Sequence, residues 1–222
     1  MPSTSFVFPA GRSRTTGLDY GPRDTGTVLV LAPGAGAPQT HPWMVFVAGA
    51  LSERGVHVVT FNFPYAEERR RVPDKNDVLE STWCAAIDAV RARSDFAARR
   101  LFIGGKSMGG RIATQVAARK EVEVAGLVLL GYPLHPPGKP LQLRSAHLSA
   151  VRAPMLFVQG SRDPFGTPEE LGPIARNLVP GTRLFVVEGG DHSLAVPKGR
   201  GESHDAVFGR VADEVARFMG SR

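Results

Sequence analysis

Six short apolar runs are spaced along this chain of 222 residues, and each of them ends at a turn signal. The runs are nearly continuous in Val, Leu, Ile and Phe instead of alternating with polar residues, which is typical of strands buried on both faces of a parallel sheet. Helices must then cover both sides of that sheet. The runs occupy residues 27–32, 56–61, 101–105, 127–131, 155–160 and 184–189.

Helical periodicity appears between and after these runs. Residues 111–120 are rich in good helix formers and follow directly on a strand pattern. Two further stretches repeat apolar residues at steps of three and four, which predicts amphipathic helices: Leu79, Trp83, Ile87 and Val90, then Val207, Val211, Val215 and Phe218. The alternation of strands and helices predicts an α/β fold with a mostly parallel central sheet and helices on both faces.

The remaining segments fit a single domain over residues 1–222. The first 25 or so residues are turn-rich and compatible with antiparallel edge strands. Residues 131–154 contain five prolines, so we expect a loop that crosses from one strand to the next, too short for a large helical cap. The site beneath such a loop is expected to be shallow and open.

Charge and composition favour a cytoplasmic protein. The 27 Lys and Arg outnumber the 21 Asp and Glu, but the arginines are scattered and the run at residues 69–71 follows two glutamates. We therefore expect a solvated surface without a nucleic-acid partner, and a phosphate-binding patch is the less favoured alternative. No apolar run approaches the roughly 20 residues that cross a bilayer, so no membrane insertion is expected. The N-terminus lacks a secretory pattern, which favours the cytoplasm. The single cysteine, Cys84, excludes an internal disulfide and a Cys-based zinc cluster.

The segment most informative about chemistry is Gly105-Lys106-Ser107-Met108-Gly109, which joins a strand pattern to a helix pattern. This is the nucleophile-elbow pattern, in which a serine projects from a sharp strand-to-helix turn. The turn brings backbone so close that side chains two positions either side of the serine must be absent. Gly105 and Gly109 meet this demand, so the pattern predicts Ser107 as a nucleophile.

Two glycine-containing nucleotide-binding motifs match the sequence in part, but each lacks a glycine at a position that the motif requires. A phosphate loop ending at Gly105-Lys106-Ser107 needs a glycine at position 100, which is Arg100. A dinucleotide fingerprint starting at Gly34 needs a glycine at position 39, which is Gln39. We therefore expect no nucleotide cofactor, and no metal or organic cofactor of another kind.

A serine hydroxyl needs a base and an orienting acid to become a nucleophile. His192 follows the last apolar run and Asp163 follows the one before it, so the chain order is Ser, Asp, His. All three residues stand at carboxyl ends of predicted strands, where an open α/β sheet forms its ligand crevice. Asp191 is a rival acid, but adjacent residues rarely have the geometry for a hydrogen bond between their side chains, so we favour Asp163.

An acyl-transfer site also needs two donors for the oxyanion. We expect the backbone N–H of Met108 as one, and the N–H of Ala35, with Gly36 in reserve, as the other. The alternative for the loop at 33–38 is a tight turn before a helix that starts near Trp43. By topology Tyr65, His135, Lys139 and Arg111 lie near the crevice, where any of them could contact a substrate.

These residues resemble the α/β-hydrolases, and within them a short, dienelactone-hydrolase-like bacterial group related to a testis-expressed protein and to a regulatory subunit of the NSL histone-acetylation complex. The likeness spans residues 31–193 through LAPGAGAP, FNFPYAEERRR, GGKSMGGR, GYPLHPPGKP, QGSRDPFG and GGDHS. It implies Ser107 as nucleophile, Asp163 as acid and His192 as base. Pro33-Gly34 stands where many of these hydrolases have His-Gly, which leaves a backbone donor unaffected.

Taken together, the sequence predicts a serine hydrolase that cleaves a small-molecule carboxylic ester or thioester through an acyl-enzyme. Two alternatives stay open. One is a catalytically idle α/β-hydrolase fold that serves as a protein-interaction module. The other is an acyltransferase, in which an alcohol or amine outcompetes water at the acyl-enzyme.

Overall fold

One sheet of eight strands runs through the computed structural model, which describes residues 4–22, 25–93, 99–119, 122–197 and 203–220. The strand order is β1-β2-β4-β3-β5-β6-β7-β8; β1 and β2 pair antiparallel with each other, β2 pairs antiparallel with β4, and the other pairs are parallel. The strands are β1 (Thr4–Ala10), β2 (Ser13–Tyr20), β3 (Thr27–Ala32), β4 (His57–Phe61), β5 (Arg100–Lys106), β6 (Gly126–Leu130), β7 (Met155–Gly160) and β8 (Arg183–Val187).

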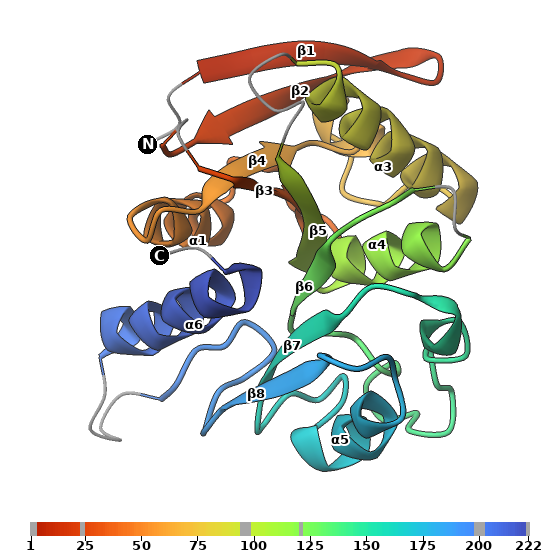
Figure 1. Ribbon diagram of the computed structural model, residues 1–222. Helices are drawn as coiled ribbons and strands as arrows, with labels where there is room; N and C mark the ends of the chain where they lie inside the picture. Colours follow the sequence, from red (N-terminus) through yellow and green to blue (C-terminus); the bar gives the residue numbers. More distant parts are fainter. Residues whose placement is uncertain (1–3, 23–24, 94–98, 120–121, 198–202, 221–222) are drawn as a thin grey trace.

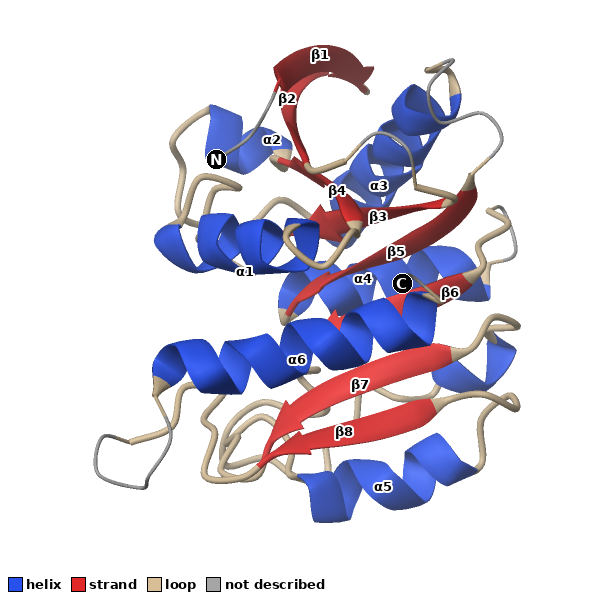
Figure 2. Ribbon diagram, turned by 60° about the vertical axis from the view of Figure 1, so that its left-hand side comes forward, coloured by secondary structure: helices blue, strands red, loops and turns tan. Residues whose placement is uncertain are grey.

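Helices cover both faces of this sheet (Figures 1 and 2). On one face lie α1 and α6, and on the other lie α3, α4 and α5. The helices are α1 (Pro42–Ser52), α2 (Pro64–Glu67), α3 (Asn76–Arg91), α4 (Met108–Ala118), α5 (Pro168–Arg176) and α6 (His204–Met219), with a short 3-10 turn at Leu148–Ala150. The predicted α/β architecture is confirmed.

The predicted strands correspond to β3 through β8, and the turn-rich N-terminus supplies the antiparallel hairpin of β1 and β2. The helices predicted from periodicity and composition are α3, α4 and α6, and residue 120, predicted to end α4, lies outside the described residues. The helix expected near Trp43 is α1, and α2 and α5 were not predicted from the sequence. Residues 131–154 form a connection without a long helix, as their prolines predict.

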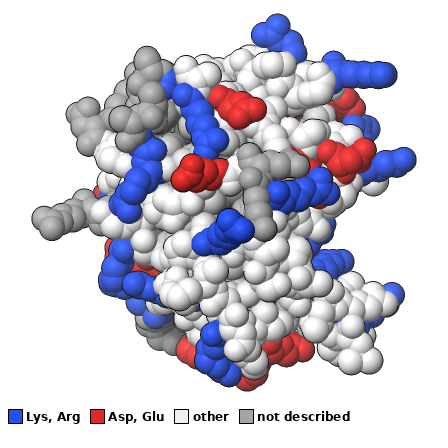
Figure 3. Space-filling model, turned by 45° about the vertical axis from the view of Figure 1, so that its right-hand side comes forward, with Lys and Arg blue, Asp and Glu red and all other residues white. Residues whose placement is uncertain are grey.

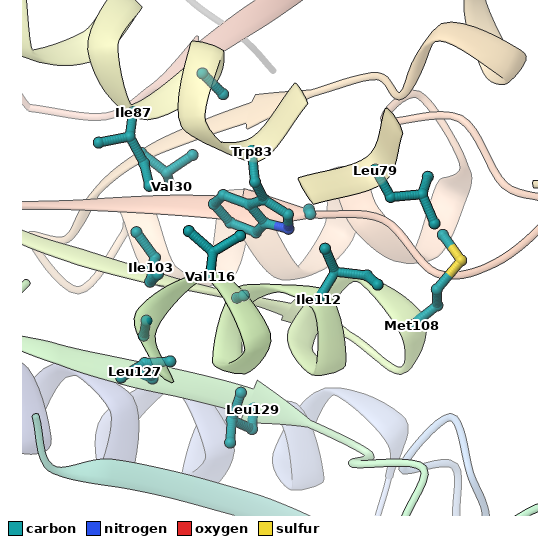
Figure 4. Close-up of a cluster of buried hydrophobic side chains, with 14 of the residues drawn as sticks. Val30, Leu79, Trp83, Ile87, Ile103, Met108, Ile112, Val116, Leu127 and Leu129 are labelled. Carbon is teal, nitrogen blue, oxygen red and sulfur yellow. The ribbon is translucent and has the colours of Figure 1, made fainter. Parts of the chain in front are cut away.

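A layer of buried side chains joins the sheet to α3 and α4 (Figure 4). Trp83 of α3 lies between the two helices and is fully buried, and its Nε1 donates a hydrogen bond of 3.2 Å to the carbonyl of Gly109 in α4. The surrounding apolar side chains from the helices and strands are Leu79, Ile87, Ile112, Val116, Val30, Ile103, Leu127 and Leu129. This packing fixes the helix that starts just after Ser107.

The parallel strands all end at one edge of the sheet, because their registers pair the last residues of neighbouring strands. Ala32 of β3 pairs with Gly105 of β5, Lys106 of β5 with Leu130 of β6, and Gly160 of β7 with Val187 of β8. Loops that follow these strands therefore meet at one place, which is where ligand crevices form in open α/β sheets.

The charged surface is mixed. Figure 3 shows a face on which Lys and Arg side chains lie singly, with Asp and Glu among them, and do not form a basic stripe. In the ranges that the structure describes, no helix has both the length and the apolar character needed to cross a membrane.

Candidate active site

Ser107 occupies a sharp turn between β5 and α4, with φ 48° and ψ −115°. A positive φ is costly for a residue with a side chain, and such strain concentrates at functional sites. The flanking glycines permit the turn. A Cβ on Gly105 would lie 2.6 Å from the carbonyl oxygen of Ala32, and one on Gly109 would lie 2.5 Å from that of Pro33. Both positions require glycine, as the elbow pattern predicts.

The structure brings Ser107, His192 and Asp163 into one hydrogen-bonded chain. The Ser107 Oγ lies 2.8 Å from His192 Nε2, and His192 Nδ1 lies 2.8 Å from Asp163 Oδ2. A carboxylate can only accept, so Nδ1 carries the imidazole proton and Nε2 accepts from the serine hydroxyl. These contacts join residues 85 and 29 positions apart in the sequence.

Asp163 is 1% exposed, and each of its oxygens accepts a hydrogen bond from a further group. Gln159 Nε2 donates to Oδ2 at 2.8 Å, and the backbone N–H of Phe165 donates to Oδ1 at 2.8 Å. These donors hold the carboxylate in place, with Oδ2 toward the imidazole. The Phe165 ring also stacks on His192, with centroids 4.2 Å apart.

Asp191 has a different role from Asp163. Its Oδ1 accepts from the backbone N–H groups of Ser193 at 2.7 Å and Ala195 at 3.0 Å. It therefore holds the turn after β8 that carries His192, and the imidazole turns away from it toward Asp163. Asp163 is thus the carboxylate that contacts the imidazole, and its role as the orienting acid stays a prediction.

Two side chains clamp the backbone of the histidine turn. Lys106 Nζ donates to the carbonyl of His192, and Trp43 Nε1 donates to that of Ser193 at 2.9 Å. The Lys106 ammonium also lies 5.5 Å from the centre of the Trp43 ring, within the range of a cation–π contact. Burial lowers the pKa of Lys106 to about 8, against the opposing effect of the Asp163 and Asp191 charges.

The loop after β3 presents backbone N–H groups beside the elbow. The N–H of Gly36 donates to the hydroxyl oxygen of Tyr65 at 3.2 Å, and that hydroxyl donates to the carbonyl of Gly34 at 3.3 Å. Among the described residues, no acceptor is seen for the N–H of Ala35. The N–H of Met108 belongs to the first turn of α4, where helices leave donors free.

A cavity of about 640 Å³ opens above Ser107. Loops after β3, β5, β6, β7 and β8 contribute to its wall, together with the start of α1 and the segment before α3. Its lining includes Gly34, Ala35, His41, Trp43, Asp74, Leu79, Lys106, Ser107, Met108, Arg111, Pro133, Arg144, Phe165 and His192. Within the described part of the chain, no cluster of three His, Cys, Asp or Glu side chains is arranged to hold a metal ion.

Three predicted substrate contacts do not reach this cavity. Tyr65 is fully buried: its ring packs in the apolar core beside Phe63, and its hydroxyl bridges Gly34 and Gly36. His135 is buried against the carbonyl of Pro136 and the Glu170 carboxylate, at 2.9 and 3.4 Å. Lys139 is exposed in the turn that follows. Arg111, by contrast, does line the cavity.

Sequence reasoning missed several residues that shape the site. Phe165 stands two residues after Asp163, and Lys106 stands directly before Ser107, so both were within motifs already identified. The only sequence feature of Trp43 was its position at a predicted helix start, which does not indicate a contact with the histidine turn. Arg144 lies in the proline-rich connection and carried no local signal.

Comparisons with known proteins agree with the fold. A family model described as an alpha/beta hydrolase domain matches residues 25–220. A dienelactone hydrolase from Anabaena variabilis superposes with a TM-score of 0.79 at 20% identity, covering 98% of this chain and 96% of the other. An α/β serine hydrolase without a lid from Xanthomonas campestris gives 0.74 at 18% identity, covering 99% and 95%.

A relative in sequence is an oxidized polyvinyl alcohol hydrolase from a Pseudomonas species, 31% identical over 120 residues. That match covers 50% of this chain and 32% of the relative. The family model covers nearly all of the chain, and the sheet, elbow and strand-end crevice have the arrangement of that family. The chain therefore belongs to the α/β-hydrolase family.

Proposed function

We propose that this protein is a serine hydrolase that cleaves a carboxylic ester or thioester through an acyl-enzyme. The observation that carries the proposal is the chain of two 2.8 Å hydrogen bonds from Ser107 through His192 to Asp163, which opens into the cavity. Nucleophile, base and orienting acid stand in the order and contacts that such chemistry needs.

In the first half-reaction, Ser107 Oγ attacks the substrate carbonyl carbon while its proton passes to His192 Nε2. Asp163 holds the imidazole in the required tautomer and stabilises the imidazolium. The tetrahedral intermediate collapses when the bond to the leaving alcohol or thiol breaks and His192 returns the proton to that group. The product is Ser107 carrying the acyl group as an ester.

In the second half-reaction, His192 removes a proton from water, whose oxygen attacks the acyl carbon. The bond between that carbon and Ser107 Oγ then breaks as His192 returns the proton to Oγ, which releases the carboxylic acid and free Ser107. In both halves the oxyanion accepts from the N–H groups of Met108 and Ala35. We prefer Ala35 to Gly36, since the Gly36 N–H is already bonded to Tyr65. The Tyr65 hydroxyl holds this loop and acts as a positioning group.

The hydrolase names of the relatives support this assignment at the level of reaction class. Free access to Ser107 through the cavity favours a small or flexible acyl group. A cytoplasmic location and kinship with the short bacterial group stay predictions.

Turnover of simple acyl donors tests the proposal. We expect the purified protein to hydrolyse 4-nitrophenyl acetate, 4-nitrophenyl butyrate and a short acyl thioester, and the Ser107→Ala and His192→Ala variants to lose this activity. Added alcohols or amines that appear in the product, at the expense of the free acid, would assign an acyltransferase. A folded wild type that turns over no acyl donor would contradict the proposal and favour the interaction module.

A further inference from the structure

The cavity wall carries more positive than negative charge. Of the described residues that line it, Lys106, Arg111 and Arg144 are basic, and Asp74 is acidic. Asp74 is already neutralised, because its Oδ1 accepts from Arg70 at 2.7 Å and its Oδ2 accepts from the N–H of Tyr65 at 2.9 Å. An arriving anion therefore meets a positive surface without a competing carboxylate.

Arg111 and Arg144 stand out because their guanidinium groups have no carboxylate partner. Neither side chain makes a hydrogen bond or ion pair with any other residue that the structure describes. Both lie close enough to the buried Tyr132 for their charges to act on its hydroxyl. Burial lowers the pKa of Arg111 and the neighbouring charge of Arg144 lowers it further, while Tyr132 and the Glu80 carboxylate act in the opposite direction without a hydrogen bond or ion pair to Arg111. Two like charges at one wall, partly removed from water, destabilise each other unless an anion joins them.

The backbones of both arginines are fixed relative to the nucleophile. The N–H of Arg111 donates to the carbonyl of Ser107 at 3.0 Å, so Arg111 lies one helical turn beyond the elbow. The N–H of Arg144 donates to the carbonyl of Leu134 at 2.7 Å, and its carbonyl accepts from the Tyr132 hydroxyl at 2.7 Å. These contacts pin the proline-rich connection against the cavity.

We infer that Arg111 and Arg144 form a subsite for an anionic group, a carboxylate or a phosphate, carried by the substrate whose acyl bond Ser107 attacks. This inference rests on the proposed function and names its substrate class. The planar guanidinium presents paired N–H donors that match the oxygens of either anion. Substrates would accordingly be half-esters of diacids, or acyl esters of phosphorylated alcohols, in preference to neutral esters.

Matched pairs of substrates test the charge requirement. Monomethyl glutarate is compared with its neutral amide, methyl 5-amino-5-oxopentanoate, and 2-acetoxyethyl phosphate is compared with 2-methoxyethyl acetate. We expect kcat/KM to be at least about tenfold higher for the anionic member of one pair, in line with charge-assisted hydrogen bonds. The pair that shows the preference distinguishes a carboxylate from a phosphate.

Variants assign the preference to these side chains. Arg111→Gln and Arg144→Gln should each reduce the anionic-to-neutral ratio by about tenfold or more, and the corresponding Lys variants should retain part of it. Arg152→Gln is the control and should leave the ratio unchanged, since Arg152 is exposed and lines a pocket other than the one above Ser107. A ratio of kcat/KM for the anionic substrate to kcat/KM for the neutral substrate near one in the wild type would overturn the inference. Gln variants whose kcat/KM falls equally for both substrates of a pair would also overturn it.

A binding measurement separates failure of the subsite from failure of the proposed function. Calorimetric titration of the Ser107→Ala protein with glutarate and with inorganic phosphate needs no turnover. We expect saturable binding of one of them that Arg111→Gln or Arg144→Gln removes. Binding without hydrolysis of any ester would retain the subsite and refute the hydrolase, whereas hydrolysis without such binding or charge preference would refute the subsite.

Discussion

Replacing Gly109 by alanine should disrupt the elbow although alanine is the better helix former. The added Cβ would lie 2.5 Å from the carbonyl oxygen of Pro33, 2.6 Å from that of Ala32 and 2.8 Å from the Ala32 carbonyl carbon. All three are backbone atoms, so no side chain can rotate away. The closest approach falls about 0.9 Å short of ordinary contact at 3.4 Å, so α4 or the end of β3 must shift.

The magnitude follows from two opposing effects. Alanine gains up to about 1 kcal/mol of helix propensity over glycine. Overpacking a rigid site costs about 1–3 kcal/mol and more where backbone must move. With three short contacts we expect the upper end, a net loss of about 2 kcal/mol in the free energy of unfolding. For a chain of this size that lowers Tm by about 4–8 °C.

Gly49→Ala is the matched control. Gly49 also lies inside a helix, α1, and a Cβ there would meet no atom within 4 Å. We expect this variant to be stabilised by about 0.5–1 kcal/mol, since only the propensity gain remains. Thermal unfolding followed by circular dichroism, with fluorophosphonate labelling of Ser107 as the functional readout, measures both effects.

The two glycine variants should move Tm in opposite directions, and Gly109→Ala should also slow labelling because it displaces the Met108 N–H. A Gly109→Ala protein as stable as Gly49→Ala, with an unchanged labelling rate, would refute the close packing of the elbow.

Three further predictions concern the groups around the nucleophile. Asp163→Ala should lower kcat/KM for a 4-nitrophenyl ester by about 10⁴-fold, and Asp191→Ala far less, because Asp191 only holds the turn; equal losses would reverse the assignment. Tyr65→Phe should lower kcat about fivefold with little change in KM, since its two hydrogen bonds to the loop that carries Ala35 are lost; an effect on KM alone would place Tyr65 against substrate. Lys106 releases its proton near pH 8 when folded and near 10.5 when unfolded, so its contribution to stability rises with pH across that window. The Tm of wild type minus that of Lys106→Met should therefore increase between pH 8 and 10, and parallel curves would contradict the burial of the charge.

The parts of the fold that could be predicted are those with a local signal. Strands β3 to β7 are nearly continuous in apolar residues because neighbouring strands and helices bury them on both faces, and the edge strand β8 keeps the same apolar pattern although it is partly exposed. The elbow was predictable because its two glycines stand two positions either side of Ser107, although the contacts that require them are mostly with the backbone at the end of β3. By contrast, α5 contains Pro173 and Gly172, which obscure it, although its capping box of Thr167 and Glu170 was a usable signal.

The parts that could not be predicted depend on contacts between distant segments. Tyr65 is buried because its hydroxyl meets backbone groups 29 and 31 residues earlier in the chain. Arg144 reaches the cavity because the connection after β6 folds back onto Tyr132 and Leu134. The residues next to Tyr65 and Arg144 in the sequence do not indicate which distant backbone groups these two residues contact.

Fluorophosphonate labelling followed by peptide mass spectrometry tests the central claim most directly. We expect label on the peptide that contains Ser107, at a rate strongly reduced in His192→Ala and abolished in Ser107→Ala. This measurement depends only on an activated serine and requires no knowledge of the substrate. A folded protein that takes no label at Ser107, or takes it equally fast without His192, would contradict the claim that these residues form a working nucleophile.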